Sequence, residues 1–319
     1  MVRVHLFTQL IRTQYYIIAQ RRSFQLDKKL KVAIIGPGKI GTDLMFKVMR
    51  SPWLEMSVMI GRKESEGILR ARSLGFDTSI DGIKYIEDHP DCCDIVFDST
   101  MAAMHRDVHA PILAKLGKFA VDLTPAAVGV SVCPVVNPEE GLRGNNVNMI
   151  TCVGQASTAA TFAISRVVPI SYVEVIAQTA SKSDGPATRK NIDEFTYTTQ
   201  NALCRLGGAK RARVYSVINP CKPECNMRNT IMAVPEGEYD LAEVDRSVRD
   251  IVARVQEYIP GYTLTMPPVN DNGIITTIIT VTGSGDFLPS YAGNLDMETA
   301  SGVRMAELYA QKVLGGEES

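Results

Sequence analysis

The chain has 319 residues, of which 45% are hydrophobic and 22% are charged, a composition that excludes a disordered or fibrous protein. This length suggests two domains. A net charge of −1 gives no electrostatic signal for nucleic acid or a membrane surface, and no apolar run is long enough to span a bilayer. Seven cysteines in so long a chain do not indicate a disulfide framework and favour a reducing compartment.

The first 26 residues differ from the rest of the chain. They contain no Asp or Glu, but they contain four arginines and apolar residues at helical spacing. This composition is typical of a mitochondrial transit peptide, which would make the protein mitochondrial. The alternative is a disordered extension or an early start codon, in a cytoplasmic protein. In either case we expect residues 1–28 to be a leader outside the fold.

The next part of the chain alternates short apolar runs with amphipathic segments. Four buried strands are expected, at 31–35, 54–60, 94–98 and 118–122. Helices are expected after the first strand, around 68–74 and over 102–116. Alternating strands and helices of this kind predict a doubly wound parallel sheet, in a dinucleotide-binding domain over residues 29–152.

The pattern changes after residue 152. Strands are expected at 171–181, 212–218, 228–234, 262–269 and 273–282, and helices at 190–206, 241–258 and 296–314. Neighbouring strands favour a mostly antiparallel sheet with helices on one face, so residues 153–295 are predicted to form an α+β domain. The fold class is therefore α/β with a second, α+β domain. The exposed face of such a sheet favours a homodimer.

A glycine loop follows the first strand and precedes a helix. Gly36, Gly38 and Gly41 form the G-x-G-x-x-G pattern of dinucleotide-binding proteins. The first glycine permits a tight turn, the second lets the backbone approach a pyrophosphate, and the third allows close packing of helix and strand. The alternative is a tight turn that binds no ligand.

The acidic residue expected at the end of the second strand is missing. Arg62 and Lys63 stand there instead, followed by Glu64. The two basic residues could accept the 2′-phosphate of NADP, and Glu64 could still bind the ribose hydroxyl of NAD. A solvated charged turn is the alternative.

Cys152 lies where a strand is expected to give way to a helix. A helix N-terminus lowers the pKa of a thiol, and the thiolate is the nucleophile, so we expect a lowered pKa at Cys152. A thiolate beside a nicotinamide suits aldehyde oxidation, whereas an inert buried cysteine is the alternative. Cys221 and Cys225 have no further ligand nearby, and the histidines lack metal-binding spacing, so no metal is expected.

Seven motifs together resemble those of acylating acetaldehyde dehydrogenase. They run in order from Lys29 to Lys312: KVAIIGPGKIGTDL, VFDST, VDLTPAAVG, NVNMITCVGQAS, DGPATRKNIDEF, VINP and LPSYAGNLD. The resemblance implies oxidation of acetaldehyde to acetyl-CoA with NAD and coenzyme A, in aromatic hydrocarbon catabolism, with 4-hydroxy-2-oxovalerate aldolase as a partner. It also implies the fold of aspartate-semialdehyde dehydrogenase, in which helix 296–314 returns to the first domain.

The resemblance assigns roles to particular residues. Cys152 matches the cysteine that carries the acyl thioester, and Asn294 matches an amide that contacts the nicotinamide end. The phosphate loop comprises Gly36, Pro37, Gly38, Lys39, Ile40, Gly41 and Thr42. A second cofactor loop comprises Ser183, Asp184, Gly185, Pro186, Ala187, Thr188, Arg189, Lys190 and Asn191. The alternatives are a helix-initiating turn at Asn294 and a Gly-Pro turn in the second loop.

The chain also departs from the family pattern. Val153 replaces a glycine beside the cysteine, which could narrow the pocket. Asn229 replaces an aspartate proposed to activate the cysteine, and an amide cannot accept the thiol proton. A catalytically idle dinucleotide-binding protein is therefore one alternative. A semialdehyde or acyl-phosphate reductase is the other, disfavoured because no histidine follows Cys152.

Overall fold

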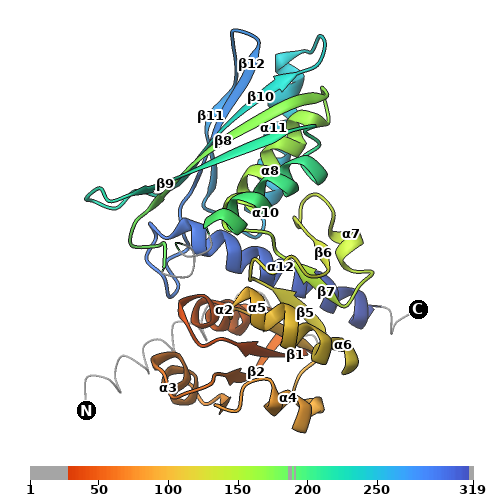
Figure 1. The fold of residues 1–319 in the computed structure, drawn as a ribbon, viewed down its shortest axis with the longest axis vertical. Helices are drawn as coiled ribbons and strands as arrows, with labels where there is room; N and C mark the ends of the chain where they lie inside the picture. The colour runs from red at the N-terminus through yellow and green to blue at the C-terminus, as the bar shows by residue number, and fades with distance from the viewer. Residues whose placement is uncertain (1–27, 186–188, 190–191, 316–319) are drawn as a thin grey trace.

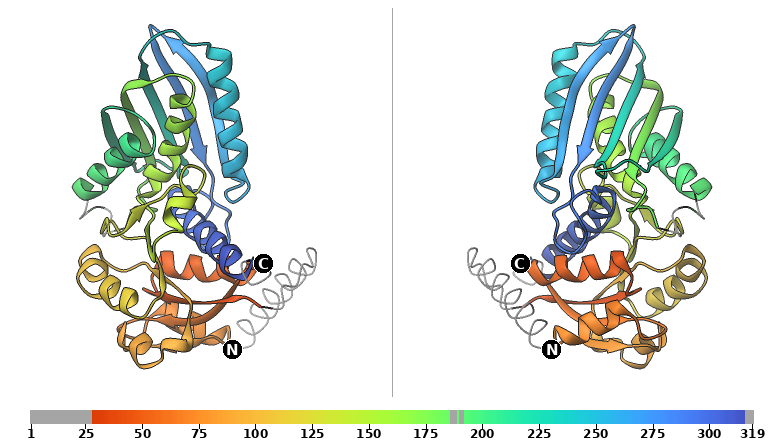
Figure 2. Two further views of the ribbon diagram at one scale, coloured as in Figure 1. Left: turned by 90° about the vertical axis from the view of Figure 1, so that its right-hand side faces the viewer. Right: turned by 90° about the vertical axis from the view of Figure 1, so that its left-hand side faces the viewer.

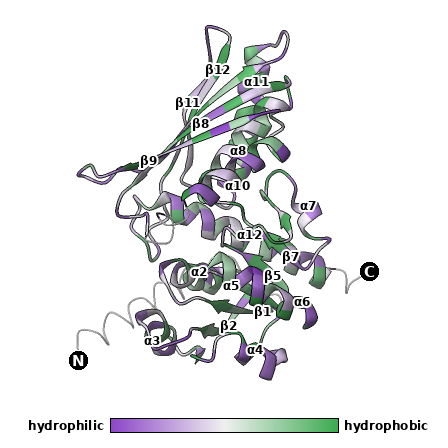
Figure 3. Cartoon of the chain, viewed as in Figure 1, coloured by the Kyte–Doolittle hydropathy of each residue, from purple (hydrophilic) through white to green (hydrophobic). Residues whose placement is uncertain are grey.

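A computed structural model of the protein describes residues 28–185, 189 and 192–315. The leader expected over residues 1–28 lies outside the described part, apart from its last residue. Two β-sheets with their helices form the described structure, one above the other in Figure 1, and the long helix α12 crosses between them. The hydrophobic residues concentrate in the strands of the lower sheet, while the outer helices carry polar residues (Figure 3).

The first sheet has seven strands, all parallel, in the order β3-β2-β1-β4-β5-β7-β6. The strands span Leu30–Ile35 (β1), Leu54–Ile60 (β2), Asp77–Ser79 (β3), Ile95–Asp98 (β4), Phe119–Asp122 (β5), Val130–Ser131 (β6) and Asn146–Asn148 (β7). This confirms the doubly wound parallel sheet that the alternation of elements predicted. The four predicted strands are present, and β7 is the strand expected before Cys152. Strands β3 and β6 were not predicted, because two or three residues have no measurable periodicity.

The helices of this half connect the parallel strands. They span Lys39–Arg50 (α2), Glu66–Ser73 (α3), Lys84–Asp88 (α4), Ala102–Met104 (α5), Ala110–Lys115 (α6) and Pro138–Gly141 (α7). The helix predicted over 102–116 is present, but its middle turn, His105–His109, is a π-helix. Pro111 has no N–H to donate to the carbonyl of Asp107, and a widened turn accommodates that missing bond.

The second sheet has five strands in the order β11-β12-β10-β8-β9. The strands span Ile170–Ala180 (β8), Ala212–Asn219 (β9), Met227–Pro235 (β10), Tyr262–Asp271 (β11) and Ile274–Val281 (β12). All pairs are antiparallel except β8 with β9. The helices α8 (Cys152–Ser165), α10 (Ile192–Arg205) and α11 (Leu241–Gln256) cover one face (Figure 2). The other face carries exposed apolar side chains, among them Ile176, Tyr215 and Val217.

Helix α12 (Gly293–Gly315) joins the two halves. Its first turns place Met297 and Ala300 in the core of the second sheet, and later turns place Met305 and Ala306 in the core of the first. The Lys47 ammonium group of α2 forms buried ion pairs with Asp43 at 2.6 Å and with Asp296 of α12 at 2.7 Å. The C-terminal helix thus packs against elements of both sheets.

Candidate active site

The glycine loop has the geometry that a dinucleotide needs. Gly36 has a φ of +104°, and a Cβ there would lie 2.8 Å from the backbone oxygen of Ser99. A Cβ on Gly41 would overlap the carbonyl oxygen of Gly36, whereas no atom lies within 4 Å of the Cβ position of Gly38. Helix α2 begins at Lys39 without a side-chain cap, so its first N–H groups are available for a phosphate. The loop therefore fits a pyrophosphate.

The end of β2 presents positive charge. Glu64 forms an ion pair with Arg72 at 2.9 Å, so its carboxylate already has a partner. Arg62 and Lys63 are exposed, and neither forms an ion pair within the described part of the chain. Both basic residues are thus available to a phosphate, which keeps the expectation of NADP binding open beside that of a solvated turn.

Cys152 begins helix α8 directly after a strained turn. Ile150 has a φ of +65°, a conformation that β-branched residues rarely adopt. The side-chain oxygen of Asn148 accepts a hydrogen bond from the N–H of Ile150 at 3.0 Å, and Thr151 caps the helix by accepting from the N–H of Gly154 at 2.8 Å. A Cβ on residue 154 would lie 2.6 Å from Cγ2 of Ile150. The motif around Cys152 is therefore a turn that fixes where the helix, and with it the thiol, begins.

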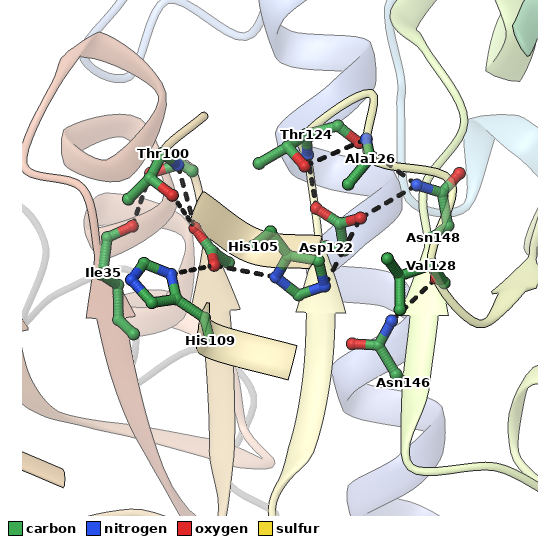
Figure 4. A network of polar contacts seen from close by, with 12 residues as sticks. Ile35, Thr100, His105, His109, Asp122, Thr124, Ala126, Val128, Asn146 and Asn148 are labelled. Carbon is green, nitrogen blue, oxygen red and sulfur yellow. Dashed lines mark hydrogen bonds and ion pairs between the residues drawn. The ribbon is translucent and has the colours of Figure 1, made fainter. Parts of the chain in front are cut away.

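A buried polar network contacts this turn through Asn148 (Figure 4). Asn148 donates to Asp122 at 3.0 Å, and Asp122 ends β5 just as Asp98 ends β4. His105 and His109 contact the same oxygen of Asp98 through their Nδ1 atoms, at 2.8 and 2.6 Å. His105 Nε2 also lies 3.6 Å from Asp122. Three strand ends and the π-helical turn thus meet in one network, which the sequence analysis did not predict.

The pKa values of the carboxyl and imidazole groups in the network shift in different directions. Burial alone would raise the pKa of Asp98, but hydrogen bonds with His105 and His109 hold it well below its usual range. Burial raises the pKa of Asp122 to about 6. Burial would lower the pKa of His105, yet its bond to Asp98 and the charge of Asp122 raise it. His105 thus lies between the two carboxylates and interacts with both. No metal-binding group of His, Cys, Asp or Glu occurs among the described residues.

A small pocket opens beside the thiol of Cys152, which is half-buried. Elements of the second sheet and its helices supply most of its walls. The lining residues are Cys152, Val153, Ala177, Thr179, Asp184, Ile192, Phe195, Ser216 and Ile218. Val153, the departure from the family pattern, forms part of the wall, as its position next to the cysteine suggested. A pocket with apolar walls and few polar groups suits a short aldehyde.

The prediction of a lowered thiol pKa at Cys152 is wrong. The cysteine does stand at the helix N-terminus, but burial raises its pKa well above the usual value. The carboxyl groups of Glu298 and Asp184 raise it further. Desolvation and two nearby acidic groups therefore outweigh the helix dipole, and the thiol is not ionised by its own surroundings.

Asn229 lies on β10 and contacts the helix that carries the cysteine. Its side chain is 1% exposed, and its amide nitrogen donates to Ser157 Oγ at 3.1 Å and to the carbonyl of Val153 at 3.5 Å. Its oxygen has no hydrogen-bond partner among the described residues. The amide thus anchors the first turn of α8, next to the cysteine.

The second cofactor loop and Asn294 meet at the pocket. Asp184 lines the pocket, accepts a hydrogen bond from the hydroxyl of Thr179, and accepts one from Asn294 Nδ2 at 3.3 Å. Ser183 bonds the carbonyl of Ala180, before the loop. The structure therefore brings Cys152, Asp184 and Asn294 to one place.

The remaining positions of that loop are only partly described. Arg189 turns back and donates to the carbonyl of Asp184 at 3.3 Å, and Gly185 has open space at its Cβ position. The predicted cofactor contacts at Pro186, Ala187, Thr188, Lys190 and Asn191 lie outside the described residues.

A dinucleotide loop at the end of a parallel strand and a cysteine at a pocket beside the second sheet define a class of enzyme, the nicotinamide-dependent dehydrogenases. Comparison with known proteins identifies the family. Residues 152–289 match a family described as "Prokaryotic acetaldehyde dehydrogenase, dimerisation". The chain is 46% identical over 302 residues to an acetaldehyde dehydrogenase of a Roseiflexus species, covering 92% of this chain and 98% of the relative. The chain belongs to the acetaldehyde dehydrogenase family.

Further comparisons agree with this family and with the fold. An acetaldehyde dehydrogenase of Thermomicrobium roseum is 48% identical over 297 residues, which cover 90% of this chain and 96% of that protein. Aspartate semialdehyde dehydrogenase II of Vibrio cholerae is 16% identical, with a TM-score of 0.58 over 88% of this chain and 98% of its own. That likeness concerns the fold alone. Among the described residues, no helix has the length and apolar character needed to cross a membrane.

Proposed function

We propose that this enzyme oxidises acetaldehyde to acetyl-CoA with NAD, through an acyl thioester on Cys152. Family membership supports the substrate and the reaction. The observation that carries the proposal is the position of Cys152, which starts α8 at the wall of a small pocket that Asp184 also lines. The thiol adds to the aldehyde carbonyl, and coenzyme A then accepts the acyl group from the thioester.

The other residues bind and enclose the reactants. The N–H groups at the start of α2, beside Gly38, hold the pyrophosphate, and Asn294 with Asp184 borders the nicotinamide end. When bound, the cofactor supplies the hydride acceptor. The apolar walls at Val153 and Phe195 limit the access of water, which protects the thioester from hydrolysis.

NAD is the expected cofactor, and NADP is expected to be tolerated. The support is the pair of exposed cations, Arg62 and Lys63, beside a Glu64 that is already paired with Arg72. Comparing kcat/KM for the two cofactors tests this proposal. A preference for NAD above roughly 10³-fold, about 4 kcal/mol, would show that the two cations do not face the ribose.

The substitution Cys152→Ser tests the mechanism. It should abolish acetyl-CoA formation from acetaldehyde, coenzyme A and NAD while leaving NAD binding intact, because the hydroxyl is a far weaker nucleophile. Cys204→Ser, in another half-buried cysteine, is the matched control and should keep full activity. Normal turnover by the Cys152 variant would remove the thioester from the mechanism. Absence of activity in the native enzyme with binding of NAD would instead favour an idle dinucleotide-binding protein.

We further propose the assembly and the location of the enzyme. The uncovered face of the second sheet, with Ile176, Tyr215 and Val217, would bury its apolar area in a homodimer, which the dimerisation family supports. A 4-hydroxy-2-oxovalerate aldolase would supply the aldehyde, and co-purification tests that partnership. The acid-free composition of residues 1–26 supports mitochondrial import, which fusion of that segment to a fluorescent protein would test.

A further inference from the structure

Helix α12 carries a second buried polar residue close to Asn294. Asn294 contacts Asp184, which lines the pocket beside Cys152. Glu298 lies four residues later on the same helix, so it shares the face of Asn294 one turn further along. This part of α12 packs against α8, whose first residue is Cys152. The fold therefore places a buried carboxyl group on the helix that packs against α8.

Glu298 is buried without a polar partner. Its side chain is only 6% exposed, and within the described part of the chain no hydrogen bond or ion pair reaches its carboxyl group. The other acidic residues along α12 differ: Asp296 pairs with Lys47, and Glu307 accepts a hydrogen bond from Ser51 at 2.7 Å. A buried carboxyl group without a partner is costly and rarely kept without a reason.

The electrostatics of the site connect Glu298 with the thiol. The charge of Glu298 acts on Cys152, while Asp122, at the end of β5, acts on Glu298. Burial raises the pKa of Glu298 well above its usual value, and the charge of Asp122 raises it further. A carboxylate with a raised pKa is a stronger base than one in solvent.

We propose that Glu298 is the proton acceptor of the Cys152 thiol, in the role that the family resemblance gives to an aspartate at position 229. The proton leaves Sγ and binds a carboxylate oxygen of Glu298, so a thiolate and a neutral carboxyl group form together. The step needs no further reactant. Asn229 then only anchors α8, through Ser157 and Val153. This inference rests on the proposed thioester function of Cys152.

The substitution Glu298→Gln tests the role because it keeps the shape of the side chain and removes the basic oxygen. At pH 7 kcat should fall by about 10²–10⁴-fold, the usual contribution of a general base, with little change in the KM for acetaldehyde. Glu298→Asp keeps a carboxyl group and should keep part of the rate. Glu307→Gln, a partly buried carboxyl on the same helix bonded to Ser51, is the matched control and should behave as the native enzyme.

Alkylation of Cys152 by iodoacetamide separates a base from a charge that merely repels the thiolate. If Glu298 accepts the proton, Glu298→Gln should slow alkylation at pH 7, and the difference should disappear above the pKa of the thiol. Alkylation that is equally fast or faster, with normal turnover, would overturn the proposal. An active Cys152→Ser variant would instead refute the thioester mechanism itself, so the two failures are distinguishable. Should the glutamine variant not fold, a folded Glu298→Asp variant with a reduced rate and a shifted pH profile would support the proposal, and one with the native rate and pH profile would oppose it.

Discussion

The substitution Asn229→Asp places a carboxyl group at position 229 and tests whether that position can also accept the proton of Cys152. In the native chain the amide nitrogen of Asn229 donates to Ser157 Oγ at 3.1 Å and to the Val153 carbonyl at 3.5 Å. In Asn229→Asp an oxygen faces that carbonyl, so two acceptors oppose each other in a buried site. Loss of a buried donor costs about 1–3 kcal/mol, so we expect the melting temperature to fall by several degrees.

The rate should respond to this substitution only when the native base is absent. With Glu298 in place, Asn229→Asp adds a second carboxyl group near Cys152, so we expect no gain at pH 7. In the Glu298→Gln background the same substitution should recover a large part of the lost rate, which is about 3–5 kcal/mol in activation free energy if the base contributes 10²–10⁴-fold. Only a base that can act from either position gives this pattern.

The assay is the pH profile of kcat for the two single variants and the double variant. At pH 9 a thiol ionises more readily without help, so the differences between the variants should shrink there. The reasoning is refuted if Asn229→Asp alone raises the rate at pH 7 tenfold or more. That result would show that the native site lacks a base and that Glu298 does not supply one.

Three further expectations follow from the described contacts. Gly38→Ala should weaken NAD binding without loss of stability, whereas Gly41→Ala should destabilise the fold by about 1–3 kcal/mol, as differential scanning calorimetry with and without NAD would show. Asn148→Ala should lower kcat through the turn at Ile150, and Ile150→Gly, which relieves the left-handed strain, should restore part of it in the double variant. Asp122, with its pKa raised to about 6, stabilises the fold at low pH and loses this effect as the pH rises through 6. The free energy of unfolding, measured with urea, should therefore rise for Asp122→Asn by about 3 kcal/mol relative to that of the native chain when the pH increases from 4 to 7.

The sequence predicted the elements that have strong periodicity. The alternating strand at 171–181 and the amphipathic helix at 241–258 appear within two residues of their expected bounds, as β8 and α11. A strand was expected before Cys152, but the bounds of the three-residue strand β7 were not predicted. Such a strand is defined by its neighbours, since Asn146–Asn148 pairs with β5 and β6, and no local pattern encodes those partners.

The parts of the candidate site that a local sequence motif defines could be predicted. The glycine loop and the cysteine at a helix start depend on local order, and the structure has both. The network of Asp98, His105 and Asp122 depends on three segments that meet only in the folded sheet. The sequence holds one indication of this network, because two successive strands each end in an acidic residue. Parallel strands place the side chains at their ends along one edge of the sheet.

The pKa of Cys152 shows why the residues next to it in the sequence do not predict the electrostatics of the site. A helix N-terminus stabilises a negative charge by about 0.3–1 kcal/mol, and at most about 2 kcal/mol, which corresponds to a shift of no more than about 1.5 units. Burial can shift a pKa by about 3–5 units in the opposite direction. The elements around this thiol, β8, β9 and α10, follow it in the chain, so nothing near residue 152 reveals its burial. A thiol in such a place needs a proton acceptor, and the acceptor must come from an element that the packing brings in. Because residue 229 is an amide, the buried carboxyl group of Glu298 on α12 is the group whose position and charge meet that need.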